Sequence, residues 1–249
     1  MAKLSVIIPA YRRHPLTVRH VEECLKSTRL PDEIIVVNDG GDPNLRDMLL
    51  EIPRKMDILY ARVEQDILWN YNGACNLGFW ISTGDIFIIE DTDHVPTRNL
   101  YEKTVEFFEK YPDCDRLAYN RNCVNISELL KPMEEWTWPK NWGPNQMVAA
   151  LTRQSYLRLK GQEERFGGHY GYMCYDWKNR YNNILKIKSM KAGVNFHAII
   201  GDEGEPGLRR GMSQENRRIY RENALSGHPQ HPKGILNFTY TIEKLPKNI

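Results

Sequence analysis

Long hydrophobic runs are absent from this sequence of 249 residues. No segment approaches the roughly 18 consecutive apolar residues that a membrane-spanning helix requires. The first residues, Met1-Ala2-Lys3-Leu4, continue directly into strand-like sequence and do not resemble a signal peptide. We therefore expect a cytoplasmic protein without a transmembrane segment.

Net charge and cysteine are also scarce. The 34 basic and 32 acidic residues leave a formal charge of +2, which provides no general basic surface for nucleic acid or an anionic membrane. The cysteines are odd in number and form no CxxC pair and no zinc-ligand spacing, so we expect reduced thiols with structural roles. They are Cys24, Cys75, Cys114, Cys123 and Cys174.

The first hundred residues alternate between strand and helix patterns. Short apolar runs rich in β-branched residues predict strands, and each is followed by turn residues and a helical pattern. This alternation predicts an α/β fold with a mostly parallel, twisted sheet flanked by helices on both faces. The expected strands cover residues 4–9, 33–38, 56–63 and 85–90, and the expected helices cover residues 15–28, 43–52, 72–82 and 97–110.

Beyond residue 115 the pattern becomes irregular, although residues 152–159 still predict a helix. Residues 201–211 are rich in glycine and charge, which is typical of a mobile loop. A short helix over 214–224 and a tail should complete the chain. We therefore expect one domain over residues 1–200 and an irregular C-terminal extension over 201–249.

Polar residues follow three of the expected strands. Tyr11 follows the first strand, Asp39 the second, and Asp91 and Asp93 the fourth. In parallel sheets of this kind, ligands bind beyond the carboxyl ends of the strands. The Asp91-x-Asp93 pair offers hard oxygen ligands suited to Mg²⁺ or Mn²⁺ bridging a diphosphate, although a solvated turn would carry the same pair.

Four segments in one order resemble the family 2 glycosyltransferases: SVIIPAY (5–11), IVVNDG (35–40), GACNLG (73–78) and GDIFIIEDTD (84–93). Members of that family are inverting enzymes of the GT-A fold. The resemblance implies transfer of a sugar from a nucleoside diphosphate donor to an acceptor hydroxyl, assisted by Mn²⁺ or Mg²⁺. It also implies a nucleotide-sugar binding half over residues 1–100 and an acceptor half over residues 101–200.

The resemblance assigns roles to individual residues in the first half. Pro9 and Tyr11 would lie beside the base and ribose, although Tyr11 could be ordinary packing. Asp39 would accept a hydrogen bond from the base, which favours a UDP, dTDP or GDP donor, because an ionised carboxylate only accepts. A turn aspartate is the alternative for Asp39. Gly73 and Asn76 would face the diphosphate, and Asp91 would contact both donor and metal.

Residues on two later segments complete this expected site. The residue before Asn76 is often basic in the family and is Cys75 here, so Arg209 and Arg210 on the glycine-rich loop could instead balance the phosphate charge. His197 follows an apolar stretch at the place where some GT-A enzymes supply a third metal ligand, and imidazole suits Mn²⁺. A core or surface histidine is the alternative for His197.

The general base is where the sequence departs from the family. Members often carry an acidic pair shortly after an aromatic-glycine turn, and residues 168–172 look like that turn. In a gapless match the pair falls on Met173 and Cys174, which cannot act as the carboxylate. We therefore expect Asp176 to be the base, while an i, i+4 pair with Arg180 is the alternative.

Two further groups of side chains could serve the acceptor. Glu163 and Glu164 are reserve candidates for the base. Trp136, Trp138 and Trp142 have flat apolar faces that suit a sugar ring, and core packing is their alternative use.

Several other functions are disfavoured. No GxGxxG motif follows a strand, which argues against a dinucleotide-dependent oxidoreductase, and the turn after the first strand lacks the glycines of a nucleotidylyltransferase. No QxxRW motif follows the tryptophan-rich segment, which favours transfer of a single sugar over polymer synthesis. A catalytically inactive nucleotide-sugar or glycan-binding module of the same fold remains the alternative function, because a fold does not guarantee activity.

Overall fold

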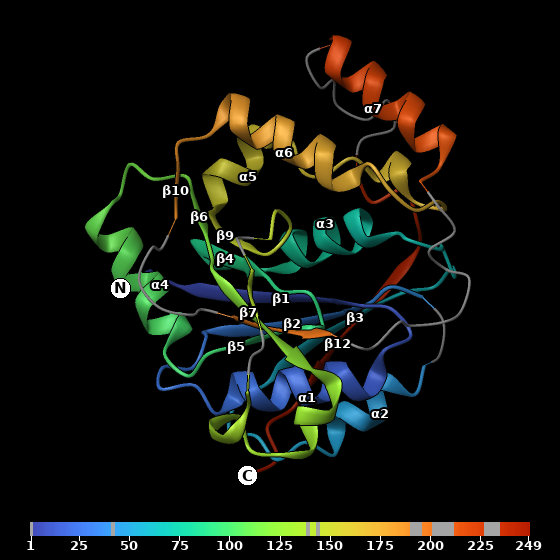
Figure 1. Ribbon diagram of the computed structural model, residues 1–249. Coiled ribbons are helices and arrows are strands. Elements are labelled where there is room, and N and C mark those ends of the chain that lie inside the picture. The colour runs from blue at the N-terminus through green and yellow to red at the C-terminus, as the bar shows by residue number, and fades with distance from the viewer. Residues whose placement is uncertain are drawn as a thin grey trace.

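A computed structural model describes residues 2–40, 43–137, 140–142, 145–189, 196–200, 212–226 and 235–249. Figure 1 shows a central twisted sheet with a layer of helices on each side. The predicted α/β architecture is confirmed, and the strands come from both halves of the chain.

The centre of the main sheet is parallel. The β1 strand (Leu4–Ala10) is buried along its whole length and pairs in parallel with two neighbours. These neighbours are β2 (Glu33–Asn38) and β4 (Ile86–Ile89), and β2 pairs in parallel with β3 (Ile58–Val63). Strands buried on both faces have near-continuous apolar sequences, which explains why the four expected strands were recognisable.

Antiparallel strands from the second half extend this sheet. The full strand order is β10-β6-β9-β4-β1-β2-β3-β12. The β9 strand pairs antiparallel with both β4 and β6, and β12 pairs antiparallel with β3 at the edge. The added strands are β6 (Arg116–Ala118), β9 (Ala149–Thr152), β10 (Ile187–Ser189) and β12 (Tyr240–Leu245).

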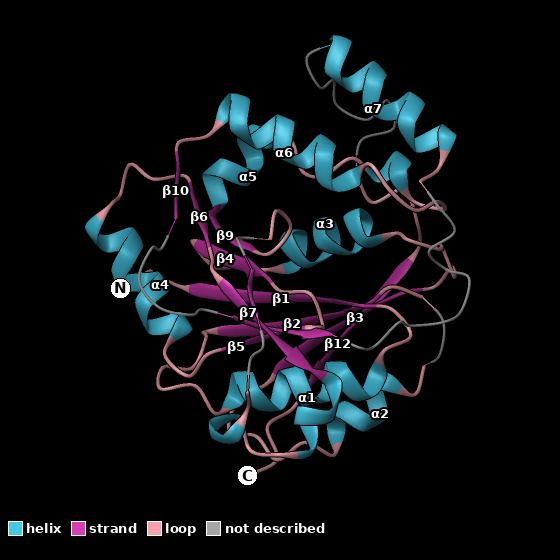
Figure 2. Ribbon diagram, viewed as in Figure 1, coloured by secondary structure: helices cyan, strands magenta, loops and turns pink. Residues whose placement is uncertain are grey.

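Alternating side chains of the sheet build a separate core on each face. Val6 and Ile8 pack with α1, α2 and α4, whereas Ile7 packs with α3, α5 and α6. The predicted coverage of both faces is therefore confirmed (Figure 2). The helices are α1 (His14–Leu25), α2 (Leu45–Leu50), α3 (Tyr71–Ile81), α4 (Leu100–Lys110), α5 (Arg153–Leu159) and α6 (Met173–Ile184).

A smaller sheet continues from the end of β4. Its strand order is β5-β11-β7-β8, and β5 begins directly after Asp93. One face of this sheet carries a small core that includes Val95, Val124 and Trp136. Its elements are β5 (His94–Pro96), β7 (Arg121–Asn125), β8 (Lys140–Trp142) and β11 (Phe196–Ile200), with short 3-10 helices η1 (Ile126–Leu130) and η2 (Met133–Glu135) between β7 and β8.

The C-terminal segment is partly built into the domain. A helix, α7 (Gln214–Ser226), occupies the position expected for the short helix and packs against α6. The tail also supplies β12, which the sequence analysis did not anticipate. The expected mobile loop over residues 201–211 lies outside the described residues. Among the helices described, none combines the length and the apolarity needed to cross a membrane.

Candidate functional site

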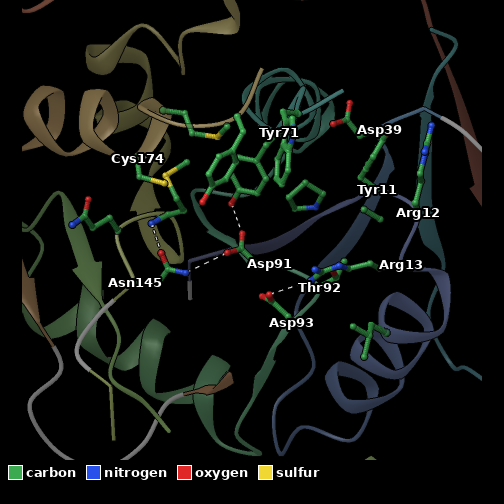
Figure 3. Close-up of a pocket in the computed structure, with 18 of the residues that line it drawn as sticks. Tyr11, Arg12, Arg13, Asp39, Tyr71, Asp91, Thr92, Asp93, Asn145 and Cys174 are labelled. Carbon is green, nitrogen blue, oxygen red and sulfur yellow. Dashed lines mark hydrogen bonds and ion pairs between the residues drawn. The ribbon is translucent and has the colours of Figure 1, made fainter. Parts of the chain in front are cut away.

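A cavity of about 1580 Å³ opens at the carboxyl ends of β1, β2 and β4. This is the edge at which ligands bind in parallel α/β sheets. Its walls also include the start of α3, the start of α6, part of α1 and η1. In Figure 3, Tyr71 and Asn145 point to Asp91 and Arg13 points to Asp93, whereas Asp39 lies at the other side of the view.

Asp91 lies at the centre of the cavity wall. The Tyr71 hydroxyl donates to Asp91 Oδ1 at 2.5 Å, and Asn145 Nδ2 donates to Asp91 Oδ2 at 3.2 Å (Figure 3). Burial raises the pKa of Asp91, and the nearby charge of Asp93 raises it further. A cation beside the two carboxylates would relieve both effects.

Asp93 is held by groups from three elements. Arg13 follows β1 and donates to Asp93 Oδ2 at 3.3 Å, while His94 Nδ1 lies 2.6 Å from Asp93 Oδ1. Arg121 of β7 donates to His94 Nε2 at 2.8 Å, which fixes the ring and leaves the Nδ1 proton directed at Asp93. The pair is therefore embedded in a network of defined geometry.

Asp91, Asp93 and His94 together have the composition of a divalent-cation site. One ligand atom from each lies within 4.8 Å of the others. Two carboxylates and one imidazole suit Mn²⁺, and the carboxylates alone suit Mg²⁺. A cation would take the place of the proton shared between His94 Nδ1 and Asp93, so the residues present fit the expected metal.

His197, the expected third ligand, is not brought to this group. In the β5–β11 ladder His197 pairs with Val95, whereas Ala198 pairs with His94. Opposed residues of a ladder share a face and successive residues alternate, so His197 and His94 lie on opposite faces. The ring of His197 packs edge-on against Trp136 at 5.4 Å between centroids, and burial lowers its pKa to about 4. His94 therefore replaces His197 as the candidate third ligand, and metal binding by His197 stays a prediction that its position does not support.

Asp39 lies at the other end of the cavity and is buried. Asn70 Nδ2 donates to Asp39 Oδ1 at 2.9 Å, which leaves the second carboxylate oxygen able to accept from a ligand. Burial raises the pKa of Asp39 well above its ordinary value. Pro9 and Tyr11 line the same end, and the Tyr11 hydroxyl donates to Asp66 at 2.9 Å. These three expected residues are therefore brought together.

Gly73 and Asn76 are on α3 but do not line the cavity. A Cβ added to Gly73 would lie 2.3 Å from Asn70 Oδ1, so the glycine permits close packing of the helix start. Asn76 is fully buried, and its Nδ2 donates to Glu164 Oε1 at 2.7 Å. The expectation that these two residues face the diphosphate is therefore not supported by their surroundings.

Asp176 is also directed away from the cavity. It is buried on α6, where Arg180 donates to Oδ2 at 3.3 Å and Asn223 of α7 donates to Oδ1 at 2.8 Å. Cys174 lines the cavity, and two residues of helix rotate a side chain by about 200°. The structure thus does not bring Asp176 to the cavity and shows the i, i+4 contact with Arg180 that was its alternative. Its role as the base stays a prediction that this position does not support.

The reserve candidates for the base, Glu163 and Glu164, also form hydrogen bonds with other parts of the chain. Glu163 accepts from the Arg165 backbone N–H and from its guanidinium, at 3.1 and 2.8 Å. Glu164 accepts from the backbone of residues 236 and 237. Among the described residues that line the cavity, the carboxylates are Asp39, Asp91 and Asp93.

Of the three tryptophans expected to contact the acceptor, the structure describes the side chain of Trp136. Trp136 is buried, and its indole N–H donates to the Lys131 carbonyl at 3.1 Å, so this residue belongs to the small core. The side chains of Trp138 and Trp142 lie outside the described residues, as do Arg209 and Arg210. The predictions for these four residues remain untested.

The aromatic wall of the cavity instead consists of Trp69, Tyr170 and Tyr172. Trp69 and Tyr170 have ring centroids 4.8 Å apart. Trp69 and Tyr172 adopt left-handed backbone conformations with φ of 56° and 64°, which bulky residues adopt only where the surrounding structure enforces them. Asn216 of α7 is fully buried and donates to the carbonyl of Gly171 at 2.9 Å, which helps to hold this turn.

Several functional residues escaped the sequence analysis. Tyr71 and Asn145 contact Asp91, and Arg121 contacts His94, only in the folded chain, because the three residues are far apart in the sequence. His94 directly follows the pair in sequence, and Arg13 directly follows the first strand. The position of these two residues at the ligand-binding edge was the available signal for them.

Comparison with known proteins identifies the family and the fold of the chain. The model of the family "Glycosyl transferase family 2" matches residues 5–158. An uncharacterized glycosyltransferase of Rickettsia bellii is 30% identical over 109 residues, which represent 44% of this chain. The same alignment covers only 15% of the Rickettsia protein, so much of that relative has no counterpart here.

Solved structures share the fold. Residues 1–349 of S. aureus TarS, in complex with UDP-GlcNAc, superpose with a TM-score of 0.69 at 12% identity, covering 90% of this chain and 66% of that one. The mannosyltransferase PcManGT from Pyrobaculum calidifontis, in complex with GDP-Man and Mn²⁺, gives a TM-score of 0.55 at 18% identity, covering 91% and 63%. The expected GT-A fold is therefore confirmed.

The family match begins in β1 and ends in α5, so it includes every strand whose carboxyl end contributes to the cavity. It also covers more than half of the chain. The chain belongs to glycosyl transferase family 2.

Proposed function

We propose that this protein transfers a single sugar from a nucleoside diphosphate donor to an acceptor hydroxyl, with inversion and with a divalent metal. The observation that supports this most is that Asp91 and Asp93 line a cavity with Asp39 at its other end. The buried His94 lies within 4.8 Å of both carboxylates and completes a group that could hold a metal ion. Mn²⁺ or Mg²⁺ bound there would stabilise the negative charge that develops on the departing diphosphate. Residues 1–100 form the donor half in this proposal, and residues 101–200 the acceptor half.

The chain's own residues prepare the cavity for a donor. Asp39 accepts an N–H of uracil, thymine or guanine at the free carboxylate oxygen. Tyr11 is held by Asp66 beside that position. The two solved structures of the same fold contain UDP-GlcNAc and GDP-Man, which supports a nucleotide sugar as the ligand class.

The acceptor would enter along the aromatic wall. Trp69, Tyr170 and Tyr172 offer flat apolar faces together with polar edges, which suits the C–H face and the hydroxyls of a sugar. A glycan acceptor agrees with this composition. Inversion requires the acceptor hydroxyl to attack the anomeric carbon from the side opposite the departing diphosphate, through an oxocarbenium-like transition state.

One observation favours the alternative of an inactive sugar-binding module. Asp176, Glu163 and Glu164 all take part in buried or partly buried hydrogen bonds, and none lines the cavity. An acceptor hydroxyl needs a group to take its proton, and removing such a group typically costs 10²- to 10⁴-fold in rate. A donor-binding protein without transfer activity would fit the same cavity.

The two functions are separated by measuring binding and transfer on the same protein. Thermal shift with UDP-, dTDP- and GDP-sugars, with Mn²⁺ or with excess EDTA, identifies the donor, because a ligand that binds only the native state raises stability. Transfer to a panel of glycans is then followed with that donor, and the product's anomeric configuration is read by NMR. Metal-dependent transfer with inversion supports the proposal. Donor binding without transfer or hydrolysis supports the module.

A further inference from the structure

A second group of metal-ligating side chains lies in the helix layer of α1 and α4, outside the cavity. His20 and Cys24 come from α1, Glu90 is the residue between β4 and Asp91, and Tyr101 comes from α4. All four side chains are fully buried. None of them lines the cavity described above, so the proposed transfer reaction leaves them without a role.

These side chains converge on one point. His20 Nε2 lies 2.6 Å from Glu90 Oε2, and Cys24 Sγ lies 3.8 Å from the same oxygen. The Tyr101 hydroxyl lies 2.9 Å from Cys24 Sγ and 3.3 Å from Glu90 Oε2. The ligand atoms of His20, Cys24 and Glu90 are all within 4.8 Å of one another. A single ion could contact all of them after small side-chain movements.

Hydrogen bonds alone leave this cluster incomplete. Glu90 Oε1 and His20 Nδ1 are buried and have no hydrogen-bond partner among the residues that the structure describes. Within the described part of the chain, no lysine or arginine pairs with Glu90, and His20 is its ion-pair partner. A buried carboxylate with one oxygen unsatisfied is costly unless a further positive charge is present. The incompletely bonded carboxylate therefore favours a cation in this cluster, where His20 Nε2 and Cys24 Sγ meet Glu90 Oε2.

We propose that His20, Cys24 and Glu90 bind a structural Zn²⁺ ion. A thiolate, an imidazole and a carboxylate are the three ligand types that zinc combines in proteins. The two negative ligands would balance the charge of the ion in an otherwise uncharged core. His20 and Cys24 are four residues apart on one helix, so they lie on the same face and can bind one ion together.

The metal would enter with modest rearrangement. Zinc bonds of roughly 2.0–2.3 Å require ligand atoms to be more than about 3 Å apart. His20 Nε2 and Glu90 Oε2 would then separate by about half an ångström from their present 2.6 Å. The Tyr101 hydroxyl lies beside Cys24 Sγ and Glu90 Oε2 and could provide a fourth ligand atom for the ion.

This site would connect α1 and α4 to the end of β4, one residue before Asp91. Its expected effect is therefore on the stability of the native fold, because metal binding to a preformed site contributes directly to folding. It is separate from the proposed Mn²⁺ or Mg²⁺ site, which contains no sulfur ligand. The two sites can be distinguished by metal type.

The experiment uses the full chain with Asp91→Asn and Asp93→Asn, so that the cavity site cannot contribute. After expression in zinc-supplemented medium and dialysis, elemental analysis should find about one Zn²⁺ per chain. Adding Co²⁺ to the metal-stripped protein should produce the near-ultraviolet charge-transfer band of a cobalt–thiolate bond. In the same background Cys24→Ser should lose that band, whereas Cys174→Ser should retain it, because Cys174 lies at the cavity.

The cobalt experiment on the double Asp variant requires no change in the buried cluster, so it decides the question even if Cys24→Ser fails to fold. A folded protein without stoichiometric zinc and without a cobalt–thiolate band would overturn the proposal. A band that persists in Cys24→Ser and disappears in Cys174→Ser would overturn it as well, by moving the thiolate to the cavity. Sugar transfer is not a readout here, so this result is independent of the proposed function.

Discussion

Carboxylates in two regions of the molecule have opposite surroundings. Asp39, Asp91 and Asp93 follow strands of the main sheet and line the cavity. Glu164 and Asp176, from the segment between α5 and α7, are buried, and their oxygens are occupied by amides, backbone N–H groups and Arg180. The first group is available to a ligand, while the second holds segments of the chain together.

The two histidines repeat this contrast within one small sheet. His94 contacts Asp93 and Arg121 at the cavity, whereas His197 packs against Trp136 in the small core. They belong to neighbouring strands and differ by the face on which the side chain emerges. Proximity in the fold therefore does not establish a ligand, and the direction of each side chain decides its role.

The largest expected effect is on folding, in Asp176→Asn. This change leaves Arg180 buried without its anion, and breaking a buried pair typically costs about 3–5 kcal/mol. Denaturant unfolding should show this loss, while calorimetry on the folded fraction should show unchanged donor affinity. The exposed Asp47→Asn on α2 is the matched control and should unfold like wild type. Unchanged stability with a collapse of turnover would restore Asp176 as the base.

The next effect is on catalysis, in Asp93→Asn. The variant keeps the size of the side chain but weakens the contacts to His94 and Arg13 and removes a charged ligand. We expect turnover to fall by roughly 10²- to 10³-fold, the usual loss when one stabilising group is removed from a developing charge. Steady-state kinetics over a Mn²⁺ titration checks this, again with Asp47→Asn as the control. Near wild-type turnover, or full activity of the wild type in excess EDTA, would remove the metal from the proposal.

A smaller effect concerns His197 and depends on pH. Burial lowers its pKa to about 4 from the ordinary value of 6.5, so the unfolded chain binds a proton in this range and the folded chain does not. Stability should therefore fall as the pH decreases from about 6.5 to about 4, by up to about 3 kcal/mol. His197→Gln should remove this dependence in pH-resolved unfolding, whereas the exposed His169→Gln should retain it. Loss of Mn²⁺ affinity in His197→Gln would instead return this residue to the metal site.

The first half of the fold was predictable from sequence because its signals are local. Residues 4–10 and 33–38 are mostly apolar, rich in β-branched residues and buried on both faces. Each strand can therefore be recognised from its own short segment of sequence. The aspartates that directly follow such strands lie at the ligand-binding edge of the sheet. This is why Asp39, Asp91 and Asp93 could be placed at the cavity before the structure was available.

The second half depends on contacts that no local pattern contains. The β12 strand joins β3 across more than 170 residues of sequence, and its side chains are mostly exposed. The role of Asp176 depends on the rotation of α6 relative to α7, which is set by Arg180 and Asn223. The role of His197 depends on the register of β11 against β5. A one-residue shift of β11 against β5 would have moved His197 to the face that carries His94.

The smallest expected effect is in Asp39→Asn, and it has opposite signs for binding and for stability. The variant loses the charged acceptor for the nucleobase, so calorimetry should show donor affinity weaker by about 1.5–3 kcal/mol.

Burial raises the pKa of Asp39 above its ordinary value of 3.8, so the folded state favours the protonated form. The resulting stability is present below that ordinary value and is lost as the pH rises through the folded-state pKa. Asparagine carries no such penalty, so Asp39→Asn should unfold at a higher temperature than wild type at neutral pH, and the difference should vanish in acid. Asp66→Asn, nearby but half-exposed, should not gain stability in this way, because the pKa of Asp66 is lowered by Arg12 and Tyr11. A stabilised Asp39→Asn with full donor affinity would show that Asp39 is a buried turn residue and that the base is recognised elsewhere in the cavity.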